Sequence, residues 1–172
     1  MRLDDNDFTL FGLPAQFTQD RKELDARWRA LQSEVHPDRF VGEGGAAQRL
    51  AMQWAVRVNE AHQRLKDPLK RGAYLCEMRG APISAESNTA MPAEFLMQQM
   101  AWREALDDAN GSADVETIDA TVALQEAFLL NEVGVLLDQR DDAPAAAQQV
   151  RALMFIARFR DDIRRRLETL DV

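Results

Sequence analysis

The sequence is poor in the residues that build metal sites and covalent crosslinks. It contains one cysteine, Cys76, and two histidines, His36 and His62. A lone cysteine cannot form a disulfide within the chain, and one thiolate with two scattered histidines does not supply the ligand set of a zinc site. We therefore expect no metal and no cofactor, and a reducing compartment.

The sequence also lacks the features of secreted, membrane and nucleic-acid-binding proteins. The opening residues MRLDDNDF contain no apolar run of signal-peptide length, and we find no stretch approaching the roughly 18 apolar residues that cross a bilayer. The net charge of −8 disfavours nucleic acid, because phosphate backbones repel an acidic surface. Hydrophobic residues make up 46% of the chain, which is sufficient for a core. These features predict a cytoplasmic protein with neither membrane nor nucleic acid as partner.

What the sequence does contain is helical periodicity, without the alternation typical of strands. A short element around Phe8 and Phe11 follows an acidic cap and stops at Gly12. The next helix spans about 17–36, is capped by Thr18 or Asp20 and ends before a proline. Its apolar face consists of Leu24, Trp28, Leu31 and Val35.

A second long helix over about 46–67 completes a helical hairpin. Its expected core face consists of Leu50, Trp54, Val58, Ala61 and Leu65. Asp67 and Pro68 then begin a short helix that Gly80 closes.

The second half of the chain predicts a three-helix bundle. The stretch GAPISAESNTAMP has loop composition, and helical patterns follow over about 92–109, 114–138 and 144–170, with short connections typical of antiparallel neighbours. We therefore predict an all-α fold, with a helical domain over 1–80, a linker over 81–91 and a bundle over 92–172, L-shaped if the linker is stiff.

The sequence HPDRF, residues 36–40, lies between the two hairpin helices. In its plainest interpretation Pro37 stops a helix, Asp38 caps a turn and His36 bonds a carbonyl. A catalytic interpretation of His36 and Asp38 is weak, because no nucleophile or third member accompanies them and GEGG is not a phosphate-binding loop. A recognition role fits better, because a proline-stiffened loop between packed helices displays Asp38 at little ordering cost.

These residues resemble a J domain, the module by which co-chaperones bind ATPase chaperones of the DnaK type. The resemblance rests on HPDRF between two helices, on VNEAHQRLKDPLKRGAYL and on the short helix after it. With the opening FTLFGLP and the C-terminal half, the chain resembles the HscB family of iron–sulfur co-chaperones over nearly its full length. It lacks the cysteine-rich extension of some eukaryotic members and thus looks like the bacterial form.

The resemblance implies a non-enzymatic protein with two partners, the DnaK-type chaperone HscA and the IscU-type cluster scaffold. It implies that Asp38 engages a basic residue of the chaperone. Phe40 matches the family aromatic, with a core plug as the alternative, and the basic patch is diluted by nearby carboxylates, so ordinary solvated arginines are an alternative there. The implied chaperone-binding residues are His36, Pro37, Asp38, Arg39, Arg27 and Arg29.

The predicted helix over 92–109 has two apolar faces. At 100° per residue, Phe95 and Trp102 fall within about 60° of each other on a core face, whereas Leu96, Met97 and Met100 centre roughly 150° away. The second face suits either a protein partner or packing against the N-terminal domain. The residues that the resemblance assigns to scaffold binding are Leu96, Met97, Met100, Glu104, Asp108 and Phe155, the last of which lies about 100° off the core stripe of its helix and is expected to be exposed.

Two other functions stay open on the sequence. One is a J-domain co-chaperone serving a different client, which would differ at the C-terminal face only. The other is a helical adaptor in which HPD is accidental.

Overall fold

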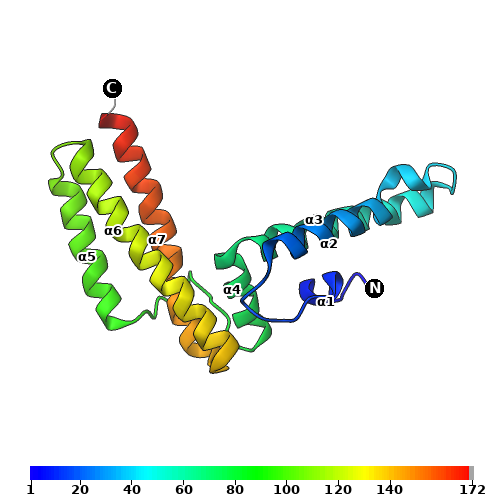
Figure 1. Cartoon of the computed structure of the whole chain (residues 1–172), viewed down its shortest axis with the longest axis horizontal. Helices are drawn as coiled ribbons and strands as arrows, with labels where there is room; N and C mark the ends of the chain where they lie inside the picture. Colours follow the sequence, from blue (N-terminus) through cyan, green and yellow to red (C-terminus); the bar gives the residue numbers. More distant parts are fainter. Residues whose placement is uncertain (171–172) are drawn as a thin grey trace. The chain divides into compact units, whose positions relative to one another are not determined.

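A computed structural model describes residues 1–170, and the helices within that range are joined by loops without a strand. The predicted all-α fold is thereby confirmed. The chain divides into two compact units, Met1–Tyr74 and Leu75–Val172 (Figure 1). The predicted domain limits, 1–80 and 92–172, stay predictions, and the last two residues of the second range lie outside the described residues. The elements are α1 (Asp7–Phe11), α2 (Arg21–Val35), the 3-10 turn η1 (Pro37–Phe40), α3 (Gly45–Lys66), α4 (Pro68–Met78), α5 (Ala93–Asp108), α6 (Ser112–Gly134), the π-helical segment η2 (Val135–Gln139) and α7 (Ala143–Leu170).

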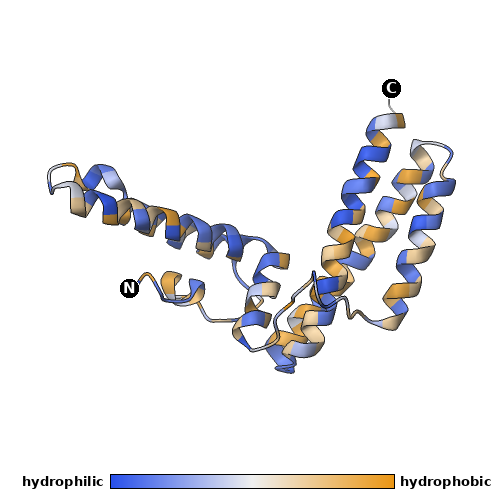
Figure 2. Cartoon of the chain, turned by 180° about the vertical axis from the view of Figure 1, so that it is seen from behind, coloured by the Kyte–Doolittle hydropathy of each residue, from blue (hydrophilic) through white to orange (hydrophobic). Residues whose placement is uncertain are grey.

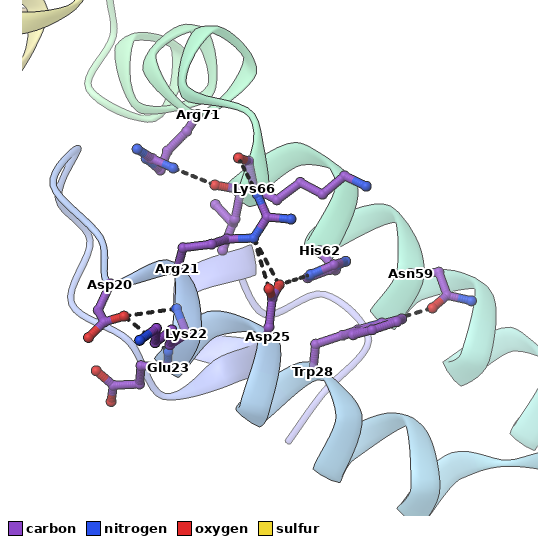
Figure 3. Close-up of polar contacts among 11 residues, drawn as sticks. Asp20, Arg21, Lys22, Glu23, Asp25, Trp28, Asn59, His62, Lys66 and Arg71 are labelled. Carbon is purple, nitrogen blue, oxygen red and sulfur yellow. Dashed lines mark hydrogen bonds and ion pairs between the residues drawn. The ribbon is translucent and has the colours of Figure 1, made fainter.

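The bounds of α2 follow from its capping residues. Asp20, not Thr18, is the N-cap, and its carboxylate accepts hydrogen bonds from the backbone N–H groups of Lys22 and Glu23 at 2.8 and 3.3 Å (Figure 3). The helix ends at Val35 because the next residue precedes Pro37 and is extended, with ψ of 129°.

The helices α2 and α3 pack side by side as the predicted hairpin (Figure 1). Leu24 on α2 and Val58 on α3 are fully buried. The His62 ring stacks on Trp28 with centroids 4.2 Å apart, and its Nε2 lies 2.7 Å from a carboxylate oxygen of Asp25 (Figure 3). An ionised carboxylate only accepts, so Nε2 carries the proton. His62 is thus a buried residue of the hairpin.

One residue of the expected α3 face is on the outside. Leu50 is 49% exposed, whereas its neighbour Ala51 is 3% exposed. Leu50 lies eight residues before the buried Val58, which rotates it about 80° around the helix, whereas Ala51 lies seven residues before it and is rotated by about 20°. The prediction that Leu50 faces the core was wrong because the buried stripe follows the seven-residue step.

Helix α1 is held to the hairpin by a buried carboxylate. Asp7 is fully buried and forms ion pairs with Arg57 at 2.8 Å and Arg64 at 3.0 Å. Gly12 ends the helix in the left-handed conformation, with φ of 63°. The Arg27 guanidinium on α2 donates to the Gly12 carbonyl at 2.9 Å, which joins the end of α1 to α2.

In the C-terminal unit α6 packs mainly along α7, and α5 lies beside α6 (Figure 1). The expected linker is attached to this unit by Arg151 of α7. That side chain donates to the carbonyls of Ile83 at 3.0 Å and Ala90 at 2.7 Å, and Ile83 is only 3% exposed. The segment is therefore a loop with specific contacts.

One expectation about hydrophobic runs was wrong. The stretch Ser112–Gln139 is long enough for a bilayer, and an 18-residue window in it has a mean hydropathy of 1.4. Its alanines, leucines and valines raise the average although no unbroken apolar run occurs. The signal is weak, because a single helix meets these criteria by length and composition only, and 28% of that window is buried within the protein.

Candidate protein-binding sites

The tip of the hairpin presents the Asp38 carboxylate to solvent. The imidazole Nδ1 of His36 caps the 3-10 turn by accepting the Asp38 backbone N–H at 3.3 Å. Pro37 occupies the first position of the turn, where a proline fixes φ and the missing N–H is not needed. The Asp38 side chain is 86% exposed, and its Oδ2 lies 3.6 Å from His36 Nδ1. The three residues HPD therefore build a rigid turn with a carboxylate available for a partner.

Two arginines lie together at the end of the hairpin. Arg29 and Arg39 line one shallow depression with Gln32, Ser33 and His36. The Arg39 guanidinium donates to the Ser33 carbonyl at 3.3 Å, which orients it along the end of α2. This part of the predicted site is therefore brought together by the fold.

Arg27 does not line this depression, and its guanidinium is bonded elsewhere. Its guanidinium forms an ion pair with Glu23 at 2.6 Å and donates to the carbonyls of Phe11 and Gly12, each at 2.9 Å. These bonds give Arg27 a structural role between α1 and α2. Phe40 is half-buried, between the core-plug and surface interpretations.

The second face of α5 is exposed. The side chains of Met97 and Met100 are 76% and 69% exposed, and Leu96 is 40% exposed. Glu104 and Asp108 are exposed toward the end of the same helix. The face thus combines adaptable apolar side chains with carboxylates. We call these five residues the α5 patch.

Phe155 does not belong to the exposed surface, and that expectation was wrong. It is 8% exposed and packs edge-on against Phe95 at 5.7 Å and parallel to Phe159 at 5.9 Å. The Arg103 guanidinium lies 5.1 Å from its ring centroid. A position 100° off the core stripe is buried here because α7 is covered on more than one side, by α5 as well as α6. Phe155 supports α5 from beneath.

Leu124 and Phe128 on α6 are two exposed residues that the periodicity argument did not single out. They are 75% and 57% exposed. In the sequence, the sign of an unusual surface here is that uncharged residues recur at helical spacing along this part of α6. Figure 2 shows hydrophobic residues along the helix.

Known proteins match both the C-terminal part of the chain and the chain as a whole. Residues 91–164 match the family model described as the HSCB C-terminal oligomerisation domain. The chain is 49% identical over 172 residues to a protein of Burkholderia mallei named co-chaperone protein HscB homolog, with 98% of each chain covered. It is 47% identical to the protein of the same name from Paraburkholderia xenovorans, again with 98% coverage of both.

Solved structures agree in fold. The chaperone HscB from Vibrio cholerae superposes with a TM-score of 0.81 at 35% identity, covering 96% of this chain and 99% of that one. Human co-chaperone protein HscB superposes with a TM-score of 0.89 over 100% of this chain and 86% of that one, and at 24% identity it is informative about the fold alone.

Proposed function

Because the chain belongs to the HscB family of co-chaperones, we propose that it stimulates the ATPase of a DnaK-type chaperone (HscA) and delivers an IscU-type scaffold for iron–sulfur cluster assembly. The hairpin tip is the chaperone-binding site in this proposal, and the α5 patch is the scaffold-binding site. The exposed Asp38 carboxylate on a stiffened turn is the observation that carries it.

At the tip, the proposed contact is a charge-assisted hydrogen bond between Asp38 and a basic side chain of the chaperone. Such a pair contributes about 1.5–3 kcal/mol where water is partly excluded. His36 and Pro37 hold the turn, so little conformational entropy is lost on binding. Arg29 and Arg39 add positive charge for an acidic surface of the chaperone. A role for Arg27 in this contact has less support, because its guanidinium is bonded to Glu23 and to backbone carbonyls.

At the α5 patch, Met97 and Met100 supply the apolar anchors for the scaffold. Methionine side chains adapt to the partner's shape, and the carboxylates of Glu104 and Asp108 set charge complementarity around them. Phe155 contributes indirectly, by supporting Phe95 and hence α5. Leu96 extends the anchor at the start of the helix.

The chemistry in this proposal belongs to the chaperone. The co-chaperone favours the chaperone conformation in which hydrolysis is fast, which is an effect of differential binding. Carrying both sites on one chain raises the effective concentration of scaffold at the chaperone. The protein acts as a non-enzymatic, cytoplasmic partner of both proteins.

The test is a steady-state ATPase assay of the cognate HscA-type chaperone with this protein, with the scaffold and with both. The proposal expects stimulation by this protein alone and a larger stimulation when the scaffold is present. An unchanged ATPase rate under all three conditions would contradict it.

The assay, combined with a pull-down of the scaffold, also separates the two other functions. A J-domain co-chaperone for a different client would stimulate the chaperone but fail to retain the scaffold in a pull-down. A helical adaptor with an accidental HPD would leave the ATPase unchanged.

A further inference from the structure

The α5 patch presents two methionine thioethers to solvent. Met97 and Met100 are the two most exposed of the seven methionines in this chain. They lie three residues apart, which places both side chains on one side of α5. Met91 and Met154, by contrast, are half-buried. A reagent in solution therefore reaches the sulfur atoms of the patch more easily than those of Met91 and Met154.

The chain offers no reactive thiol that would consume an oxidant first. Cys76 is the only cysteine, and it is fully buried. Burial raises the pKa of its thiol to about 11, so the reactive thiolate form is nearly absent at neutral pH. Oxidation of this chain by a peroxide is therefore expected at exposed methionines and not at the cysteine.

The oxidation itself transfers one oxygen atom and two electrons. A lone pair of the thioether sulfur attacks one oxygen of hydrogen peroxide, and the S–O bond forms as the O–O bond breaks. The proton on the transferred oxygen passes to the other oxygen, which leaves as water. The sulfur is oxidised to a sulfoxide and the peroxide is reduced. The product replaces an adaptable apolar side chain by a polar one.

We propose that Met97 and Met100 form an oxidation-sensitive switch, in which hydrogen peroxide converts their thioethers to sulfoxides and lowers the affinity of the α5 patch for the scaffold. An apolar partner surface leaves the new sulfoxide oxygens without a hydrogen bond, which weakens binding at least about tenfold. A thiol-dependent reductase resets the switch, because two thiols form a disulfide and release the oxygen as water. The inference rests on the proposed function of the α5 patch as the scaffold-binding site.

Oxidation at these two positions is expected to change binding and to leave the fold intact. The core side of α5 is held by Phe95 and Trp102, whereas Met97 and Met100 lie in solvent. The hairpin tip, residues 36–40, contains no methionine. The oxidised protein therefore still stimulates the chaperone through the tip and no longer adds the scaffold-dependent increment.

The first test treats the full chain with hydrogen peroxide, removes the reagent and titrates the chain with unoxidised scaffold in a calorimeter. The affinity is expected to fall at least about tenfold with a nearly unchanged melting temperature. Peptide mass spectrometry is expected to find sulfoxide at Met97 and Met100 before Met154. Equal affinity before and after oxidation of both methionines would overturn the switch and leave the proposed function standing. An untreated chain that does not bind the scaffold would overturn the proposed function and the switch with it.

The second test removes the two sulfur atoms. Met97→Leu combined with Met100→Leu keeps two apolar side chains of similar volume that peroxide does not oxidise. The ratio of its affinities before and after treatment is expected to be about one, independent of its starting affinity. Met52→Leu is the matched control, because Met52 is exposed but lies outside the patch, and this variant loses as much affinity as the wild type.

A repair experiment needs no variant. The two methionine sulfoxide reductases, one for each sulfoxide epimer, are expected to restore the affinity of the oxidised wild type. A loss of affinity in the leucine double variant as large as that of the wild type, or a loss that repair does not reverse, would refute the switch.

Discussion

At the scale of single residues, the proposed chaperone contact depends on the charge of Asp38. The His36 imidazole accepts from the backbone N–H of this residue, so the turn is held without help from the Asp38 carboxylate. A substitution that removes the charge and keeps the shape therefore tests recognition separately from folding.

We predict that Asp38→Asn lowers stimulation of the chaperone ATPase at least about tenfold at a fixed concentration, since a lost charge-assisted bond of about 1.5–3 kcal/mol corresponds to that factor or more. The side chain is exposed, so the free energy of unfolding changes by less than about 0.5 kcal/mol. ATPase rates and urea unfolding curves measure the two effects. A normal rate with the variant would rule out the proposed contact.

A second residue-scale prediction concerns Asp25 in the hairpin. The hydrogen bond from His62, with the one from Arg21, holds the pKa of the Asp25 carboxyl below its ordinary value of 3.8. A carboxyl with a lowered folded-state pKa stabilises the fold above its unfolded-state pKa and loses that contribution as the pH falls through the folded-state value. We expect Asp25→Asn to be less stable than the wild type at neutral pH. The difference shrinks between about pH 5 and pH 2 in urea titrations. A difference that grows as the pH falls would contradict this assignment.

At the scale of secondary-structure elements, the end of α1 requires a glycine. Gly12 has a φ of 63°, and an added Cβ would lie 2.9 Å from the Arg27 guanidinium that bonds its carbonyl. Both the backbone conformation and the contact therefore oppose a side chain.

We predict that Gly12→Ala destabilises the protein by about 1–2 kcal/mol, measured by chemical unfolding. The matched control is Gly42→Ala, because Gly42 has no atom within 4 Å of an added Cβ. That variant is expected to be neutral or slightly stabilising. Equal losses of stability in the two variants would show that the left-handed conformation is not the cause.

Helix α5 provides the second element-scale prediction. Its core face is held by Phe95 and Trp102, whereas Met97 and Met100 are exposed. Met97→Ala combined with Met100→Ala is therefore expected to weaken scaffold binding about tenfold or more and to leave the melting temperature nearly unchanged. Isothermal titration with the scaffold and a thermal melt measure the two outcomes. A large drop in melting temperature would show that these methionines pack in the core.

At the scale of the whole molecule, the proposed function requires both sites on the same chain. The tip belongs to the unit Met1–Tyr74 and the α5 patch to the unit Leu75–Val172, and one continuous chain carries both proposed sites. An intramolecular second contact benefits from an effective concentration that two separate chains do not provide.

The corresponding prediction is a failure of complementation. Asp38→Asn keeps the scaffold site and the Met97/Met100 double alanine variant keeps the tip, yet a mixture of the two is not expected to restore scaffold-dependent ATPase stimulation. Full recovery in the mixture would show that the sites act independently.

The sequence by itself determined the long helices and the HPD turn, whereas it left Thr18 or Asp20 open as the cap of α2 and expected an acidic cap for α1, where the amide of Asn6 is the N-cap. These are local properties: a 3.6-residue period, a proline that ends a helix and a carboxylate that caps one act within a few residues of the chain. The second apolar face of α5 was predictable from a local property too, because the spacing of Phe95 and Trp102 indicates which side of the helix faces the core.

The tertiary structure alone decided which side chains are covered by distant parts of the chain. Asp7 was expected in an acidic cap. Its side chain is instead fully buried and forms ion pairs with Arg57 and Arg64, which lie at least 50 residues further along the chain. Phe155 is covered by α5 although its position on α7 suggested exposure, and two carboxylates of α6, Asp119 and Glu126, form ion pairs with Arg160 of α7. Burial and ion pairing depend on what the fold brings alongside a residue, and a helical period specifies only the direction in which its side chain points.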